Sequence, residues 1–499
     1  MKVDDHTPPN GTVRDWLDDR ASTDGDRDAY LFFDGEPALT WSDLQSKAKQ
    51  LAQQLTALGL NKGTSVAILQ PNGRKAIECL YGVLYGGFRA TVINLVAGDE
   101  AIGYALDHCE ARIALVGEAQ VNLFERVSPT RMSRLTEAGD NKAPVLHRLE
   151  PADDALLMYT SGTTGRPKGV VHSHASLLAG GWTPTVAHRL TPSDRGLCVL
   201  PIYHINGLCV TVISALVSGG SLAVAEKFST SKFWDQCEEA KATWFSVVPT
   251  IISHLLHSDI TPSPNTRDRL RFGRSASSPL APDVQTAFEA RFEVPIVETM
   301  GLTETAAQIL SNPLPPGIRK IGSPGKAFGN EACILSPDLI PLPPHLQGEI
   351  AVRGPNVMRE YLKNPDATGE TFTSDGWLRT GDLGHIDNDG YFFVTGRLKE
   401  LIIKGGENIA PREIDEALYS HPDVIEAAAF ARPCKTYGER VEAAVKLCDG
   451  STLSSEQLVE ICVQKLGAFK SPDTVYLLEE LPKGPSGKIQ RIKLPEMTR

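Results

Sequence analysis

Hydrophobic positions along the first half of the chain alternate between helical spacing and short continuous runs. Apolar residues recur every three or four positions over residues 40–60, which predicts an amphipathic helix, and the apolar run at 65–70 predicts a buried strand. The same alternation continues through a helix at 74–85, a strand at 90–93, a helix at 99–108, a strand at 112–116 and a further unit at 214–224. We therefore expect doubly wound α/β layers.

The pattern changes after the Pro-rich stretches at 312–316 and 336–344. Short β-like runs rich in Gly and Asp follow as far as Gly396, which predicts a more β-rich subdomain. After Arg397 the pattern predicts a helix at 411–419, a strand at 424–430, a helix at 454–466 and a strand at 474–478. We therefore expect a large N-terminal domain at residues 1–397 and a small α+β domain at 398–499.

Composition narrows the classes of partner. Apolar residues make up 41% of the 499 residues and charged residues 22%, which is typical of a globular protein. The net charge of -11 gives no reason to expect nucleic acid or an anionic membrane as a partner, because both require clustered Lys and Arg. Any phosphate site must therefore be local.

Cysteine usage and the chain ends indicate the compartment. The nine cysteines are scattered without a C-x-x-C pair, which is typical of a reducing environment. The first residues are polar and acidic, no stretch approaches the length of a membrane span, and the C-terminal Met-Thr-Arg is not a peroxisomal signal. We expect a cytoplasmic protein with no membrane partner.

The segment from Tyr159 to Gly169 is the most informative in the chain, and it directly follows an apolar strand at 155–158. Glycine N–H groups can turn toward an anion, hydroxyls donate to phosphate oxygens, and a lysine adds a cation. It is not a Walker A loop, because Gly-Lys-Ser/Thr is missing. An exposed Ser/Thr/Gly turn is the alternative. The candidate phosphate-binding residues are Thr160, Ser161, Gly162, Thr163, Thr164 and Lys168.

This segment resembles the signature loop of the adenylate-forming superfamily, which includes acyl-CoA synthetases, peptide-synthetase adenylation domains and luciferases. Further matches follow in the family's order over nearly the whole chain: Pro201 to His204, Gly301 to Glu304, Thr380 to Asp382, Gly396-Arg397, Lys404 to Ile409 and Pro482 to Lys488. The resemblance implies a large AMP-binding domain, a small mobile C-terminal domain, and the use of ATP, Mg²⁺ and coenzyme A. A carboxylic acid would form an acyl-adenylate and pyrophosphate, and coenzyme A would then take the acyl group.

The resemblance also implies roles for individual residues. Attack of a carboxylate on the α-phosphate brings anions together, so the site needs a metal and cations. Glu304 corresponds to the magnesium ligand, with Thr163 beside it, Asp382 to the carboxylate that accepts the ribose hydroxyls, and Lys488 to the lysine that catalyses adenylation. The remaining nucleotide contacts would be Arg397, Ser277, Thr299, Met300 and Thr303. Each role has an ordinary alternative. Glu304 could be a solvated carboxylate and Asp382 a turn residue, and Arg397 and Lys488 could be surface cations.

The second half-reaction would use another face of the small domain after rotation about a hinge at Lys399. Gly405 and Gly406 would then line a pantetheine channel, although a simple hairpin would also use adjacent glycines. His204 lies where the family gates the acyl site, and a structural histidine is the alternative.

Two departures from the family pattern concern adenine and the acid. Met300 replaces the usual aromatic residue before Gly301, so a thioether would contact adenine. Arg274-Ser275, followed by Ser277-Ser278, resembles the oxalate-CoA ligase branch. A guanidinium near a small pocket suits a second carboxylate or a sulfonate on the substrate, whereas pairing with a structural carboxylate is the alternative. The expected substrate-binding set is His204, Asn206, Arg274 and Ser275.

Several functions compete at this point. A free acyl-CoA ligase is favoured because the chain ends eleven residues after Lys488, which leaves no room for a carrier domain. An amino-acid adenylation enzyme is weaker, because Ile205-Asn206 supplies no Asp for a substrate ammonium. A scaffold with a dead site is weaker still. Within the ligases, a short-chain or aromatic monocarboxylic acid is the alternative to a dianionic one, and the sequence leaves a homodimer open.

Overall fold

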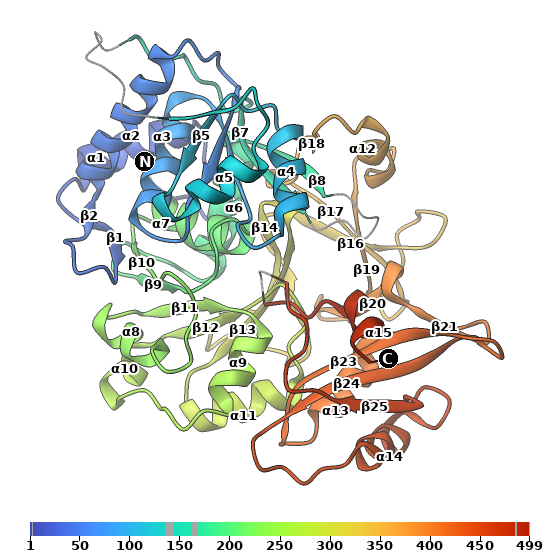
Figure 1. Ribbon diagram of the computed structural model, residues 1–499. Helices are drawn as coiled ribbons and strands as arrows, with labels where there is room; N and C mark the ends of the chain where they lie inside the picture. The colour runs from blue at the N-terminus through green and yellow to red at the C-terminus, as the bar shows by residue number, and fades with distance from the viewer. Residues whose placement is uncertain (2, 136–143, 161–166, 485–486, 499) are drawn as a thin grey trace.

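The computed structural model describes residues 1, 3–135, 144–160, 167–484 and 487–498, and it has a large N-terminal domain and a smaller C-terminal domain (Figure 1). The predicted elements are confirmed with small shifts at their ends. The helix expected at 40–60, for example, is α2, Trp41–Ala57. Its start is set by Thr40, which accepts from the Asp43 N–H while Asp43 accepts from Thr40, as in a capping box.

One sheet of the large domain has parallel pairing in its centre and antiparallel strands at both ends. Its order is β15 (Lys326–Ala327), β14 (Ala307–Ser311), β13 (Ile296–Leu302), β12 (Phe272–Ser275), β11 (Trp244–Val247), β9 (Arg195–Cys198), β10 (Ser221–Val224), β1 (Asp28–Phe32) and β2 (Leu39–Thr40).

A second sheet also has parallel pairing in its centre, where the strands follow buried apolar runs, but it is antiparallel at one end only. Its order is β18 (Glu360–Tyr361), β8 (Lys168–Ser173), β7 (Asp154–Thr160), β4 (Arg89–Val92), β3 (Ser65–Leu69), β5 (Ile113–Val116) and β6 (Ser133–Arg134). The antiparallel hairpin of β7 and β8 flanks the predicted phosphate segment.

Helices connect and cover these sheets, as expected for doubly wound layers. They are α1 (Val13–Thr23), α2, α3 (Arg74–Gly86), α4 (Asp99–His108), η1 (Glu118–Gln120), α5 (Val121–Val127), α6 (His174–Ala187), η2 (Asn206–Ile213), α7 (Ser214–Ser218), α8 (Phe233–Glu239), α9 (Pro249–Leu256), α10 (Pro264–Arg269), α11 (Pro282–Phe292), η3 (Thr303–Thr305) and α12 (Pro365–Thr371).

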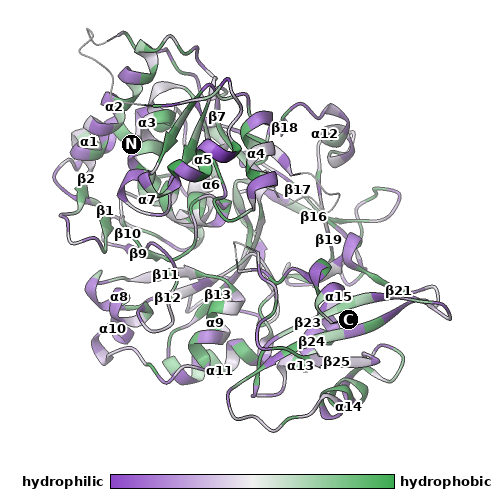
Figure 2. Ribbon diagram, in the orientation of Figure 1, coloured by the Kyte–Doolittle hydropathy of each residue, from purple (hydrophilic) through white to green (hydrophobic). Residues whose placement is uncertain are grey.

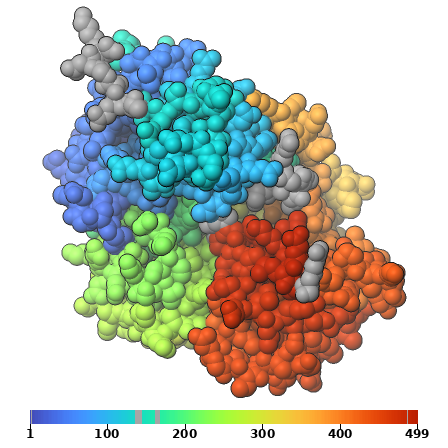
Figure 3. Space-filling model, viewed as in Figure 1, coloured from blue at the N-terminus to red at the C-terminus, as the bar shows by residue number. Residues whose placement is uncertain are grey.

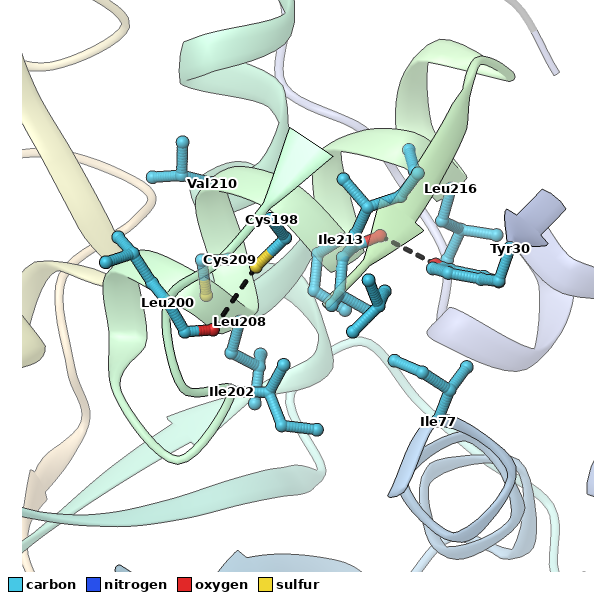
Figure 4. Packing of buried hydrophobic residues seen from close by; sticks show 14 of the residues in the cluster. Tyr30, Ile77, Cys198, Leu200, Ile202, Leu208, Cys209, Val210, Ile213 and Leu216 are labelled. Atoms are coloured by element: carbon cyan, nitrogen blue, oxygen red, sulfur yellow. Dashed lines mark hydrogen bonds between the residues drawn. The ribbon is translucent and has the colours of Figure 1, made fainter. Parts of the chain in front are cut away.

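The helix η2 has π geometry, which the sequence pattern did not predict. It is buried on every side, and Figure 4 shows its Leu208 and Cys209 on the side of Cys198, Leu200 and Ile202, and its Ile213 on the side of Tyr30. Hydroxyls bond back to carbonyls one turn earlier, from Thr211 to Gly207 and from Ser214 to Val210. Such back-bonding distorts a helix, and π turns are frequent at functional sites.

The β-rich subdomain is confirmed as an antiparallel sheet with the order β16 (Glu331–Leu335), β17 (Gly348–Arg353), β19 (Leu378–Ile386) and β20 (Phe392–Arg397). After η4 (Leu398–Glu400), the C-terminal domain pairs β22 (Glu407–Ile409), β21 (Ile402–Lys404), β24 (Gly438–Leu447) and β23 (Val424–Cys434), with β25 (Thr474–Leu477) beside β24. Its helices are α13 (Pro411–Tyr419), α14 (Ser455–Leu466), η5 (Arg491–Lys493) and α15 (Leu494–Met497). The boundary at 397/398 stays a prediction.

Apolar residues gather in the strands and inner helices, and polar residues at the periphery (Figure 2). The C-terminal domain has a core of its own, in which β23, β24, α13 and α14 contribute side chains. Figure 3 shows its red surface against the green segment of the large domain. No helix in the described part of the chain is long and apolar enough to cross a membrane.

Candidate active site

A cavity of about 770 Å³ lies where the two domains meet. Its walls come from the ends of β7 and β13, the start of η2, the loop after β12, the strands β19 and β20, and the segment after Pro482. The structure brings together most of the residues that the sequence singled out: Thr160, Lys168, His204, Asn206, Arg274, Ser277, Thr299, Met300, Thr303, Glu304, Asp382, Arg397 and Lys488 line this cavity.

The other predicted residues are not among those that line it. Ser275 is fully buried, and its hydroxyl has no partner among the described residues. Gly405 and Gly406 form the turn between β21 and β22, at the outer end of the small domain (Figure 1). Ser161, Gly162, Thr163 and Thr164 lie outside the described residues. The roles given to all of these residues stay predictions.

Glu304 lies in the η3 turn after β13, and the Tyr361 hydroxyl donates to its Oε1 at 2.7 Å. The Lys168 ammonium lies 4.6 Å from the centre of the Tyr361 ring. No group of three or more His, Cys, Asp or Glu in the described part of the chain forms a metal cluster. A single carboxylate such as Glu304, with one oxygen outside the Tyr361 hydrogen bond, fits Mg²⁺, which usually takes one or two carboxylates and completes its shell with phosphates and water.

Asp382 and Arg397 face each other across the hairpin of β19 and β20, because their Cα positions are paired in its register. The Arg397 Nε lies 3.1 Å from Asp382 Oδ1. Burial raises the pKa of the Asp382 carboxyl, and Arg397 and Lys488 oppose that shift. Oδ2 is not used by the Arg397 ion pair, so the carboxylate retains an acceptor for a ribose hydroxyl.

Lys488 reaches the cavity from the small domain. Its Nζ lies 3.7 Å from Glu400 Oε1, and Glu400 also faces Arg491 at 3.6 Å. The carbonyl of the preceding residue, Gly487, accepts a hydrogen bond of 3.2 Å from Thr250 of α9. The large domain thus holds the backbone beside the lysine.

Arg274 lies on β12 and is 1% exposed. Its Nη1 donates to Asn206 Oδ1 at 2.6 Å and to Ser246 Oγ at 3.3 Å, and its Nε donates to Gln308 Oε1 at 3.2 Å. All these partners are neutral, and none of the ion pairs in the described part of the chain involves Arg274. Burial lowers the pKa of the guanidinium to about 9. The described residues therefore offer no structural carboxylate for this cation.

Two further polar residues, Asn206 and His204, line the cavity beside Arg274. Asn206 Nδ2 donates to Ser277 Oγ at 3.2 Å, so the amide links Arg274 to the loop after β12. His204 is half-buried, its Nε2 has no partner among the described residues, and loss of solvent around the ring lowers its pKa to about 4. The imidazole is therefore neutral at physiological pH and offers one free nitrogen at the cavity.

Sequence reasoning missed several residues of this site. Glu298 lines the cavity, accepts from the Leu280 N–H at 3.1 Å, and keeps Oε2 without a partner. Burial raises the pKa of this carboxyl to about 7. Its place two residues before Met300 was a usable signal, since it is the one charged residue inside β13, Ile296–Leu302. Tyr361, Thr250 and Gln308 carried no such signal, because their partners are distant in the sequence.

Comparisons with known proteins identify the family. Residues 17–362 match the AMP-binding enzyme family, and residues 413–488 match the AMP-binding enzyme C-terminal domain. The chain is 44% identical to a sulfoacetate–CoA ligase of Cupriavidus necator, over 95% of this chain and 96% of that protein. It is 35% identical to an oxalate–CoA ligase of Arabidopsis thaliana, over 96% and 97%.

Solved structures agree with this assignment. ATP-bound MatB from Rhodopseudomonas palustris superposes with a TM-score of 0.89 at 30% identity, covering 98% of this chain and 99% of that one. The match spans both domains, so the two-domain fold is that of an adenylate-forming enzyme. The chain therefore belongs to the AMP-binding enzyme family and is an AMP-forming acid–thiol ligase that uses ATP, Mg²⁺ and coenzyme A.

Proposed function

We propose that the enzyme activates a small carboxylic acid that carries a second anionic group, such as a sulfo acid or an oxalate-like dicarboxylate. The observation that carries this proposal is Arg274, a buried guanidinium with only neutral partners among the described residues. A buried charge without a counter-ion is costly, and a bound anion would remove that cost. The names of the sulfoacetate and oxalate ligases that the chain resembles support the same class of acid.

The cavity residues suit the steps of this reaction. Arg274 would bind the second anionic group, with Asn206 holding the guanidinium in place. The reacting carboxylate would then lie toward Lys488, whose ammonium would bridge it to the α-phosphate. Glu304 and Thr163 would hold Mg²⁺, which neutralises charge on the phosphates when bound. Asp382 would accept the ribose hydroxyls.

A substrate panel tests this proposal. Pyrophosphate release is measured with sulfoacetate, oxalate, malonate and succinate, and with acetate, propionate and benzoate, each with and without coenzyme A. We expect the acids with a second anionic group to give the highest kcat/KM. Sulfoacetate and oxalate are compared first. Preference for a monocarboxylic acid would contradict the substrate class, and pyrophosphate release driven by amino acids would contradict the ligase assignment.

Arg274→Met tests the residue itself. Losing a desolvated charge pair should raise KM for the dianionic acid and cost about 2 to 4 kcal/mol in kcat/KM, while ATP binding stays nearly unchanged. Arg267→Met, at a partly exposed arginine of α10 that pairs with Asp268 and Glu293, is the matched control. Equal losses for dianionic and plain monocarboxylic acids would show that Arg274 only supports the fold.

A further inference from the structure

Tyr361 occupies a position between two groups of the ATP site that belong to different parts of the large domain. It lies on β18, paired with Val170 of β8, and is 6% exposed. Its backbone N–H donates to Thr368 Oγ1 at 3.0 Å, which ties the strand to α12. The ring is therefore held on a rigid edge of the sheet, with its hydroxyl at the cavity.

One side chain thus makes two different contacts. The Tyr361 hydroxyl donates to Glu304 Oε1 at 2.7 Å, and the ring face receives Lys168 Nζ at 4.6 Å from its centre. The backbone of the same segment also fixes the η3 turn, because the Met358 N–H donates to the Glu304 carbonyl at 2.7 Å. Burial and the nearby Glu304 carboxylate raise the pKa of Tyr361, so its hydroxyl remains a donor.

Each contact restricts a group that would otherwise be mobile. A hydrogen bond to one carboxylate oxygen selects a single orientation and leaves the other oxygen free, as outer-shell partners do for metal ligands. A cation above an aromatic face is attracted to it electrostatically. Lys168 forms no ion pair among the described residues, so the ring is the contact that places its ammonium.

We propose that Tyr361 is a positioning residue that fixes the Glu304 carboxylate and the Lys168 ammonium relative to each other, so that Mg²⁺ and the ATP phosphates are received together. The inference rests on the proposed ATP site. It assigns a separate role to each part of the side chain. The hydroxyl orients Glu304 toward Mg²⁺, and the ring places the Lys168 ammonium near the phosphates.

This division is tested by equilibrium binding of ATP, measured calorimetrically with Mg²⁺ and again with EDTA. Tyr361→Phe keeps the ring and removes the hydroxyl, so Kd for MgATP should rise about tenfold or more, whereas Kd for metal-free ATP should stay within about twofold. Tyr361→Leu removes both contacts and should weaken binding under both conditions. The double variant Glu304→Gln/Tyr361→Phe is compared with Glu304→Gln alone. Its Kd for MgATP should rise no more than its Kd for metal-free ATP, because the carboxylate that the hydroxyl orients is already absent.

The outcomes separate the two levels of the proposal. Wild-type affinity for MgATP in Tyr361→Phe would overturn the inference alone. Equal weakening of MgATP and metal-free ATP by Tyr361→Phe would also overturn it, because a purely structural role predicts that result. Wild-type protein that does not bind MgATP would overturn the proposed function and the inference with it. Equal thermal unfolding of the variants confirms that folding is not the cause.

Discussion

The cavity residues differ in how firmly the rest of the protein holds them. Arg274 and Asn206 are buried and His204 is half-buried, and all three are arranged before any acid binds, whereas Lys488 depends on the position of the small domain. Such preorganisation removes part of the cost of orienting the substrate. At this scale the sequence singled out most of the charged groups that line the cavity, because motif residues are recognisable locally, whereas the roles given to them stay predictions.

Glu304→Gln keeps the shape of the side chain and removes its charge. If Glu304 holds Mg²⁺, pyrophosphate release should fall by orders of magnitude while thermal unfolding is unchanged. The Tyr361 hydroxyl can still donate to the amide oxygen, so the loss would report the charge. Undiminished pyrophosphate release at saturating Mg²⁺ would contradict the assignment.

Glu298 should make stability depend on pH. Its carboxyl ionises near 4.5 in the unfolded chain and near 7 in the folded protein, so between these values the unfolded state binds fewer protons. The free energy of unfolding should therefore fall as pH rises through this window, by about 3 kcal/mol in all, and stay lowered above it.

Glu298→Gln removes this titration and can keep the hydrogen bond from the Leu280 N–H. We expect the Tm of the variant, relative to wild type, to increase between about pH 5 and about pH 8, as followed by differential scanning calorimetry. A constant difference across that range would show that the carboxyl titrates normally.

At the scale of elements, periodicity predicted α2 and the buried strands, but it did not predict η2 or the order of strands in either sheet. Strand order depends on contacts between distant segments, such as Arg274 of β12 and Val297 of β13. The sequence pattern also did not predict that α9 contacts the small domain. Ser253 and His254 of this helix, and His257 directly after it, bond to Ile425 O, Glu426 Oε1 and Pro422 O of the small domain.

The contacts of α9 predict that this helix stabilises the present orientation of the domains. Replacing Ser253, His254 and His257 by Ala removes hydrogen bonds worth about 1 kcal/mol each. Adenylation, measured as pyrophosphate release, should slow more than acyl transfer from a supplied adenylate. Ser258→Ala is the control, because its hydroxyl bonds locally to Leu255 O. Equal slowing of both half-reactions would contradict this role.

At the scale of the whole molecule, the sequence predicted a large domain followed by a small one, and the C-terminal core confirms a separate packing unit. It could not predict which face of that unit meets the cavity. In this structure Lys488 lines the cavity and the Gly405 turn lies outside it. Domain alternation remains our prediction, and the two positions offer a direct test.

Lys488→Ala should abolish pyrophosphate release and still allow conversion of a supplied acyl-adenylate to acyl-CoA. Gly405→Leu should do the reverse, because a bulky side chain would obstruct the proposed pantetheine channel. Gly405 has φ +61°, and an added Cβ would lie 3.3 Å from Tyr437 Cδ1, so equal thermal unfolding must be confirmed first. If both variants lose the two half-reactions in the same proportion, one fixed conformation performs both steps.

The neutral surroundings of Arg274 bear on how such an enzyme diversifies. Amide and hydroxyl groups surround the guanidinium, so a neutral residue in its place leaves no buried carboxylate without a partner. If Arg274 selects the acid, as we propose, a gene duplicate could change the charge of its preferred acid through a single codon without leaving an unpaired buried charge. Under this proposal, the residue that selects the acid is separable from those that hold ATP, and directed evolution toward acids without a second anionic group should begin at Arg274.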